Sequence, residues 1–258
     1  MVGKKNIMID GYNLGLEKGT GVATYARNLS YALRDLGHDV SVLYGNKSSA
    51  SRDALLREIS FFDTKGGDRS GGVLEVMDQV QHAVRGPLGR RAVEVPMTGK
   101  VIADSFGSKM PHFDRIYNSA DIFKRSQSSF MLWRNLSSVA VPETPDLAHW
   151  TYPLPLKIKG VPNIYTLHDI VPLRLPHTTL DNKRRYLDLL RQLKDSADHF
   201  VTVSECSKRD IVDIVGISPD RITNTYQSVD IPASLREKPE DQVAREVEGL
   251  LGVGHKEY

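Results

Sequence analysis

The first 45 residues constrain the fold more than any other part of the chain. A short apolar run, Asn6–Asp10, is followed by a glycine-rich loop over residues 11–21. From Val22 to Leu36 apolar residues recur every three or four positions, which predicts an amphipathic helix. Gly37 stands just past its end, and a second apolar run, Val40–Tyr44, follows. Strand, helix and strand in this order predict a parallel pair joined by a right-handed crossover.

The second half of the chain shows the same alternation. The predicted strands are Asp146–Trp150, Asn163–His168, His199–Val203 and Arg221–Tyr226. The predicted helices are Thr179–Ala197, with Leu180, Leu187, Leu190 and Leu193 on its apolar face, and Cys206–Ile214. Residues 46–138 are less regular, and only Ala54–Ile59 is predicted there as a helix. We therefore predict an α/β fold with a Rossmann-like, doubly wound, mostly parallel sheet flanked by helices.

Residues 231–239 contain prolines and precede a predicted terminal helix, Asp241–Leu251. We expect one Rossmann-like domain over residues 1–232, followed by a linker and terminal helix over residues 233–258.

Composition excludes several classes of protein. The net charge of +2 over 258 residues argues against a general nucleic-acid binder. The single cysteine, Cys206, cannot form an internal disulfide, and we predict that it packs on a helix rather than acting as a nucleophile. No run approaches the roughly 20 apolar residues of a membrane span. We expect a cytoplasmic protein that meets a membrane, at its inner face, only from the surface.

Ligands of doubly wound sheets bind at the carboxyl ends of the strands. Gly19, Thr20 and Gly21 lie there, at the start of the first helix, where free N–H groups suit a diphosphate. A loop that needs positive φ is the structural alternative. A dinucleotide-binding motif would require glycine or alanine at Thr24 and an acidic residue after the second strand, and neither is present. The Gly-Lys-Ser/Thr of a P-loop is also missing.

His168 and Asp169 follow a predicted strand directly, so we expect them to face the same cleft. A histidine there can exchange a proton near neutral pH. The alternative is a histidine satisfied by a local backbone hydrogen bond. No second histidine or acid lies at helical spacing, so no metal site is predicted.

Several local segments, in order along the chain, resemble glycosyltransferase family 4, a group of retaining enzymes with the GT-B fold. The segments are GTGVATYARNL (19–29), LGHDV (36–40), HWTYP (149–153), TLHDIVPLRLP (166–176), VTVSECSKRDI (201–211) and ITNTYQSVD (222–230). They cover the regions 7–44 and 146–230, whereas residues 46–138 match weakly.

The resemblance implies roles for individual residues. Gly19, Thr20 and Gly21 would lie under the donor diphosphate, and His168 would orient the donor sugar with support from Asp169. The residues implied to line the same cleft are Tyr152, Ser204 and Lys208. The implied reaction is transfer, with retention, of a hexose such as mannose from a sugar nucleotide to a glycan or lipid-linked acceptor. No cofactor and no metal are implied.

One departure from the family concerns its donor domain, which carries a basic pair and two glutamates separated by seven residues. Glu240 and Glu248 have this spacing, but they lie in a glutamate-rich terminal helix where the match is expected by chance. We therefore expect an N-terminal, acceptor-side half that leads to a donor domain and is inactive or very weak alone. The alternatives are a non-catalytic glycan-binding or partner module and a sugar-nucleotide epimerase.

Basic residues in the middle segment, interleaved with aromatic ones, suggest a peripheral membrane contact through Arg85, Arg90 and Arg91. Solvated loops whose aromatic residues fold into the core are the alternative.

Overall fold

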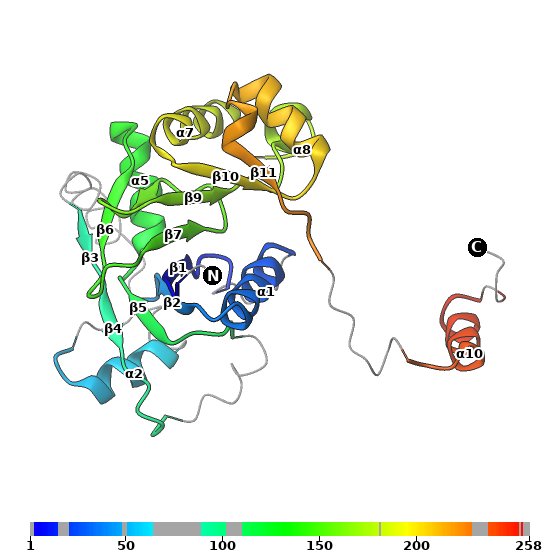
Figure 1. The fold of residues 1–258 in the computed structure, drawn as a ribbon, viewed down its shortest axis with the longest axis horizontal. Helices are drawn as coiled ribbons and strands as arrows, with labels where there is room; N and C mark the ends of the chain where they lie inside the picture. Colours follow the sequence, from blue (N-terminus) through cyan, green and yellow to red (C-terminus); the bar gives the residue numbers. More distant parts are fainter. Residues whose placement is uncertain are drawn as a thin grey trace. The chain divides into compact units, whose positions relative to one another are not determined.

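The computed structural model describes residues 3–14, 21–47, 51–63, 89–101, 110–180, 182–228, 237–252 and 254. The chain divides into two compact units, Met1–Tyr226 and Gln227–Tyr258 (Figure 1). The second unit contains helix α10 (Glu240–Leu251), which ends at Gly252 with φ +66°. All groups discussed below belong to the first unit.

A central sheet organises the first unit. Its strands are β1 (Asn6–Asp10), β2 (Asp39–Tyr44), β4 (Val93–Val95), β5 (Arg115–Asn118), β7 (Leu147–Trp150), β9 (Asn163–Thr166), β10 (His199–Thr202) and β11 (Ile222–Asn224). Their order is β11-β10-β9-β7-β1-β2-β5-β4, and within the described residues only β4 runs antiparallel to its neighbour (Figure 1). A smaller parallel sheet consists of β3 (Arg90–Arg91), β6 (Ser137–Ala140) and β8 (Leu156–Lys157).

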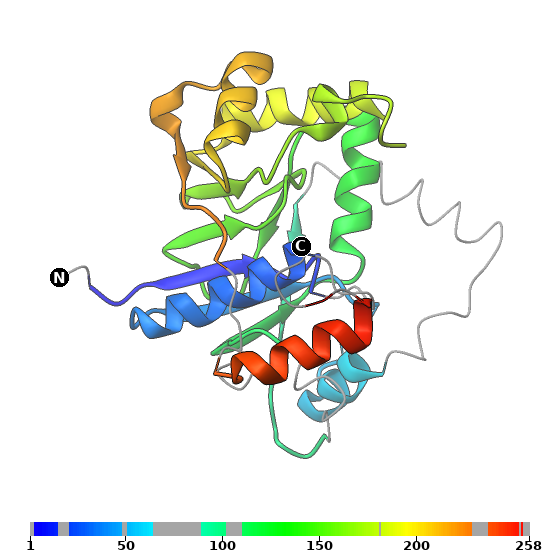
Figure 2. The same cartoon turned by 90° about the vertical axis from the view of Figure 1, so that its right-hand side faces the viewer.

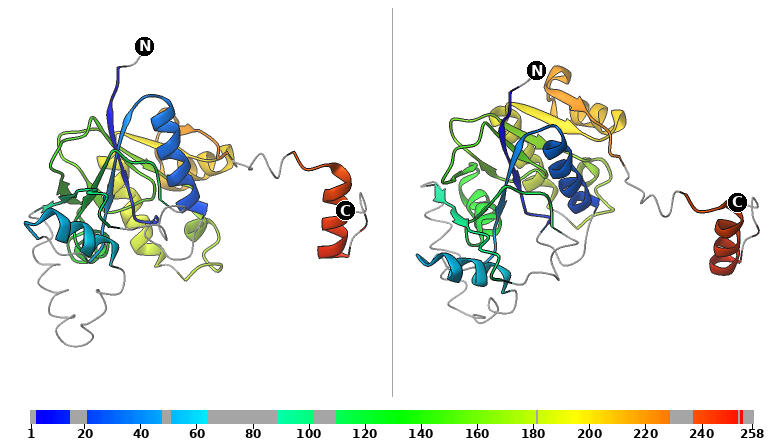
Figure 3. Two further views of the ribbon diagram at one scale, coloured as in Figure 1. Left: turned by 90° about the horizontal axis from the view of Figure 1, so that it is seen from below. Right: turned by 60° about the horizontal axis from the view of Figure 1, so that its bottom comes forward.

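Helices connect and cover the strands. They are α1 (Gly21–Asp35), α2 (Ala54–Phe62), α5 (Ile122–Trp133), α6 (Val171–Arg174), α7 (Lys183–Ser196) and α8 (Glu205–Asp210), with a π-helical turn η2 (Ile211–Val215) and a 3₁₀ turn η3 (Pro219–Arg221). Helix α1 packs against β1 and β2, and the views in Figures 2 and 3 show it beside these strands. None of the described helices is long and apolar enough to cross a membrane.

Large aromatic side chains form the centre of the core. Trp150 of β7 and Tyr165 of β9 are fully buried, and their rings stack with centroids 6.1 Å apart. The indole N–H of Trp150 donates to Asn163 Oδ1 at 3.0 Å, so this buried polar group is satisfied. Strands in parallel sheets are commonly buried on both faces, which explains why their sequences read as continuous apolar runs.

The predicted fold class is confirmed, with shifts at element ends. The predicted strand Asn163–His168 ends at Thr166, which leaves His168 in the loop beyond it. The predicted helix Thr179–Ala197 begins at Lys183, because the Asn182 side chain accepts from Arg185 N and caps it there.

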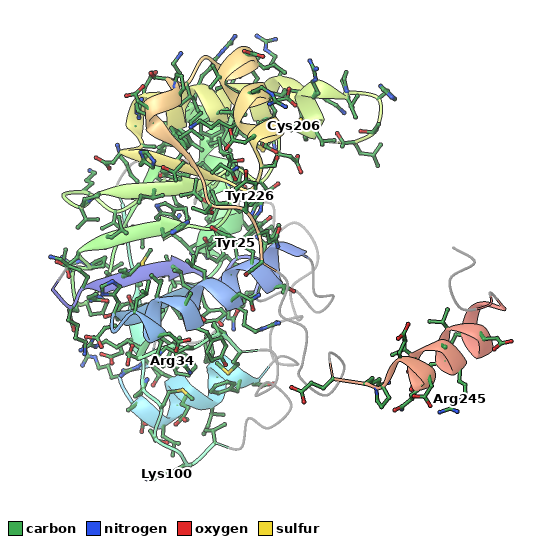
Figure 4. All side chains as sticks on the ribbon, turned by 45° about the vertical axis from the view of Figure 1, so that its right-hand side comes forward. Tyr25, Arg34, Lys100, Cys206, Tyr226 and Arg245 are labelled. Carbon is green, nitrogen blue, oxygen red and sulfur yellow. The ribbon has the colours of Figure 1, made fainter. Side chains whose placement is uncertain are left out.

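Two side chains predicted to be buried are instead exposed. Leu180 lies before the start of α7 and is fully exposed, so its place on the apolar face was wrong. Cys206 is exposed on α8, so it does not pack as predicted (Figure 4). The elements β3 to β6 and helix α5 were not predicted at all.

The chain order of the sheet reverses beside β1. From β1 the chain continues to β2 and β5 on one side, whereas β7, β9, β10 and β11 extend the sheet on the other. The carboxyl ends of β1 and β7 therefore flank the point of reversal, which is where ligands of doubly wound sheets bind.

Candidate functional site

The candidate site lies at the carboxyl ends of β1, β7 and β9. Asp10 is the last residue of β1, Thr151 follows β7 directly, and His168 comes two residues after β9. The three strands are adjacent and parallel, so their ends meet at one edge of the sheet. Residues separated by about 140 positions are thus brought together.

Asp10 is fully buried at this edge. Its Oδ1 accepts a hydrogen bond from Tyr12 N at 3.1 Å, and its Oδ2 accepts a short one from Thr151 N. Burial raises the pKa of Asp10 from 3.8 to about 6, although the hydrogen bonds from Thr151 and Tyr12 act in the opposite direction. The carboxylate is thus held by main-chain N–H groups of two separate loops.

His168 is half-buried, and its Nε2 lies 3.1 Å from the carbonyl oxygen of Thr151. A carbonyl oxygen can only accept, so Nε2 carries a proton and Nδ1 is the unprotonated nitrogen of the neutral ring. Burial lowers the pKa of His168, while the bond to Thr151 and the charge of Asp169 act the other way. The imidazole therefore makes the local backbone bond with one nitrogen and offers the other as an acceptor.

A second histidine, His149, is connected to His168 through Tyr25 and Thr166. The Tyr25 ring of α1 meets the His168 ring edge-on, with centroids 4.8 Å apart, and Tyr25 is labelled in Figure 4. The Tyr25 hydroxyl lies 3.1 Å from Thr166 Oγ1, and that oxygen lies 2.8 Å from His149 Nε2. Burial, with a smaller contribution from the charge of His168, lowers the pKa of His149 to about 4.

Aromatic rings and a buried amide are found in the loops that follow β1 and β7. Tyr12 stacks on Tyr152 with centroids 5.8 Å apart and meets Phe123 edge-on at 5.3 Å. Within the described part of the chain, the Asn13 amide nitrogen is buried and has no hydrogen-bond partner. Such atoms cost free energy unless a bound molecule or water completes their bonds.

The structure brings together some of the predicted site residues. Tyr152 and His168 follow neighbouring strands at the same edge, β7 and β9. The Asp169 Oδ1 atom accepts from Val171 N at 2.9 Å, and the charge of Asp169 raises the pKa of His168.

The two predicted residues on α8 make local bonds. The Ser204 hydroxyl accepts from Ser207 N at 3.0 Å and caps α8. The Lys208 ammonium donates to the carbonyl of Ile222 at 2.6 Å, at the amino end of β11, whereas His168 lies past the carboxyl end of β9.

Gly21 begins α1 and is exposed, and a Cβ added there would meet nothing within 4 Å. Gly19, Thr20 and Arg85 lie outside the described residues. Arg90 and Arg91 form β3, where Arg90 is half-buried and Arg91 exposed. Among the residues that the structure describes, no group of three histidine, cysteine, aspartate or glutamate side chains is placed to hold a metal ion.

Sequence reasoning missed Asp10, Tyr25, His149 and Thr166. A signal for Asp10 was available, because an acidic residue ending an apolar strand before a glycine-rich loop is unusual in a buried run. The pairing of Ile9 with His149 across β1 and β7 is what places the second histidine here, and no local pattern reports it.

An α/β domain with buried polar groups gathered at the reversal of strand order is the class of domain from which GT-B glycosyltransferases are built. The family model of Glycosyltransferase Family 4 matches residues 100–231, which contain Thr151 and His168 but not Asp10 or α1. The chain belongs to this family, and its function is of the glycosyltransferase type. A comparison with curated proteins finds none that matches the chain.

Proposed function

We propose that this chain forms the acceptor-side half of the active site of a retaining hexosyltransferase. The enzyme would move a hexose such as mannose from a sugar nucleotide to a glycan or lipid-linked acceptor. The observation that carries the proposal is the His168 imidazole, held at the reversal of strand order by the Thr151 carbonyl at 3.1 Å. No cofactor and no metal ion form part of the proposal, because the sugar nucleotide is itself the donor substrate.

The groups at this edge suit a polyhydroxylated ligand. The unprotonated Nδ1 of His168 can accept a hydrogen bond from a sugar hydroxyl. The buried Asn13 amide nitrogen can supply a further bond, since it is unpartnered in the described chain. Tyr12 and Tyr152 are half-buried aromatic rings that can cover the apolar face of a sugar ring.

The amino end of α1 suits the donor diphosphate. The positive end of a helix dipole lies at its amino terminus and attracts anions. The open space around Gly21 leaves room for a phosphate to approach the backbone. Stabilising the leaving diphosphate is the main electrostatic demand of the reaction, and a donor-binding domain would supply the rest of that charge.

The test is an assay of the chain together with a donor-binding domain against a panel of sugar nucleotides, with the anomeric configuration of the product read by NMR. We expect transfer with retention, and a kcat lowered about 100-fold or more in His168→Ala. His199→Ala is the matched control, because the His199 ring also makes a hydrogen bond through Nε2, to the Thr223 hydroxyl at 2.8 Å, but at the amino edge of the sheet. Full activity of His168→Ala would contradict the role of this residue.

Gly21→Ala tests the diphosphate site separately. Among the described residues nothing lies within 4 Å of the added methyl group, so stability should be kept while the KM for the sugar nucleotide rises. An unchanged KM would remove Gly21 from the site. Glycan binding with no transfer from any donor would favour the non-catalytic module instead.

A surface contact with a cytoplasmic membrane through Arg85, Arg90 and Arg91 is a further part of the proposal. Replacement of the three arginines by serine should weaken binding to anionic liposomes at low salt. Unchanged binding would remove the membrane from the proposal.

A further inference from the structure

We propose that Asp10 is a positioning residue for His168 and acts through the main chain of Thr151. The inference rests on the proposed function only in giving His168 a role in transfer. The chain of contacts is Asp10 carboxylate to Thr151 N–H, and Thr151 carbonyl to His168 Nε2.

The first contact, from Thr151 N–H to the Asp10 carboxylate, lies just past the last paired residues of β1 and β7. Strands β1 and β7 pair in register from Ile7 with Leu147 to Ile9 with His149. Beyond these pairs the Thr151 N–H is buried and needs an acceptor. The Asp10 side chain provides it, so the carboxylate fixes the orientation of the first peptide after β7.

The other oxygen of Asp10 restrains the loop after β1, which packs against the loop of Thr151. Oδ1 accepts from Tyr12 N at 3.1 Å, and the Tyr12 ring stacks on Tyr152. The N–H of Thr151 is therefore fixed by Asp10, and the ring of the following residue, Tyr152, is packed against Tyr12. Since peptide units are planar and only φ and ψ rotate, these two restraints define the direction of the Thr151 carbonyl.

The contact between the Thr151 carbonyl and His168 determines which ring nitrogen of His168 carries the proton. The Thr151 carbonyl selects the Nε2–H form, and the edge-on Tyr25 ring, 4.8 Å away, holds the plane of the imidazole. Nδ1 is then the nitrogen that can accept a hydrogen bond. Loss of the carbonyl would let the Nδ1–H form appear, and that form cannot accept from a sugar hydroxyl at Nδ1.

Asp10→Asn is a sharp probe of this arrangement. A carboxylate accepts on both oxygens, whereas an amide accepts on one and presents an NH₂ group on the other side. One of the two N–H groups that Asp10 holds would therefore face a donor. The side-chain shape is otherwise kept.

The matched control is Asp146→Asn. Asp146 Oδ2 accepts from Asn6 N at 2.9 Å, so it joins the same two strands, β1 and β7, at their amino ends. Both variants lose a carboxylate that accepts a hydrogen bond from a main-chain N–H. Only Asp10 is connected to His168.

The experiment is long-range proton–nitrogen NMR of the full chain labelled with ¹⁵N-histidine, with His168 assigned from its missing signals in His168→Gln. Near neutral pH we expect wild-type His168 and Asp146→Asn to show the Nε2–H form alone. Asp10→Asn should show a mixture of both forms and a further lowered pKa of His168, because the bond to Thr151 is what raises it. A folded Asp10→Asn variant with an unchanged His168 signature, whatever its stability, would overturn the proposal.

A second pair of variants covers the case in which Asp10→Asn does not fold. Thr151→Gly keeps both main-chain groups but frees φ and ψ, so it should also show the mixture, whereas Thr151→Ala should not. An unchanged signature in Thr151→Gly counts against the proposal. In the transferase assay we expect Asp10→Asn to lower kcat about tenfold with little change in KM. The NMR result does not require transfer, so failure of the proposed function and failure of this inference are distinguishable.

Discussion

The Nε2 atom of His149 lies 2.8 Å from the Oγ1 atom of Thr166, and both side chains are buried between β7 and β9. The Thr166 oxygen also lies 3.1 Å from the Tyr25 hydroxyl. Each of the three groups can donate or accept, so both hydrogen bonds can form while His149 is neutral. Burial favours that form and lowers the pKa of His149 to about 4.

The stability of the protein should therefore depend on His149 in mildly acidic solution. Its folded pKa lies below the unfolded value of 6.5, so its contribution is present above pH 6.5 and is lost as pH falls towards 4. Between about pH 7.5 and 5 the free energy of unfolding should fall by roughly 2 kcal/mol from this group. Urea unfolding at both pH values should show that His149→Gln lacks this loss.

Asp10 acts in the opposite direction, because its folded pKa of about 6 lies above the unfolded value. Its charged form costs stability above pH 6, and that cost disappears as pH falls through 6 towards 3.8, by roughly 1 kcal/mol between about pH 7.5 and 5. The quantity to compare is thus the difference between wild type and variant at each pH. An equal pH dependence in wild type and His149→Gln would contradict the prediction.

Gly45→Ala should destabilise the protein by about 1–3 kcal/mol through overpacking. A Cβ at Gly45 would lie 2.7 Å from a Phe123 ring carbon and 3.3 Å from Ile122 Cγ2. Phe123 also meets Tyr12 edge-on, so the strain would reach the candidate site. The measurement is the free energy of unfolding in urea, with Gly21→Ala as the control because its Cβ would meet nothing. Equal stabilities of the two variants would refute the overpacking.

The parts of the fold that sequence predicts well have long, regular patterns. Strand β1, helix α1 and strand β2 follow this rule, and so do β9 and α7. Strand β5, Arg115–Asn118, has only two apolar residues, Ile116 and Tyr117, and becomes a strand because β2 and β4 pair with it. In α5 the inward-facing residues include Ser126 and Ser129, and Ser126 Oγ donates to Phe123 O at 2.8 Å. Buried serines satisfied within their own helix resemble a polar face in the sequence.

The position of a site residue could be predicted where it depends on the end of a single strand. His168 follows a clear apolar strand, so its place at the sheet edge could be inferred. Asp10, His149 and Thr166 become neighbours only because β7 lies between β1 and β9, and that adjacency joins distant segments. Tyr25 fits the apolar spacing of α1, which hides its hydroxyl contact with Thr166.

Tyr25 variants should separate its ring from its hydroxyl. Tyr25→Phe keeps the ring against His168 and should leave the lowered pKa of His168 unchanged, at a cost of about 1 kcal/mol for the lost bond to Thr166. Tyr25→Ala exposes the imidazole, so the pKa of His168 should rise towards 6.5, because burial is the main cause of its lowering. NMR titration of His168 measures both. A rise in Tyr25→Phe as large as that in Tyr25→Ala would show that the hydroxyl, not the ring, controls the imidazole.

Arg221 should stabilise the sheet edge by capping α7. Its Nη1 donates to the carbonyl of Lys194 at 2.9 Å and its Nη2 to the carbonyl of Ala197, and the guanidinium lies 5.7 Å from the centroid of the Phe200 ring. The last carbonyls of a helix have no intrahelical partner, so a fork of donors is well matched to them. Arg221→Ala should lose about 1–3 kcal/mol of unfolding free energy. Arg221→Lys should recover only part of this, because an ammonium cannot reproduce the planar fork. Arg191→Ala, at an exposed position of the same helix, should change stability by less than about 0.5 kcal/mol. Urea unfolding distinguishes these outcomes, and full recovery by lysine would show that charge alone, rather than the paired bonds, holds the end of the helix.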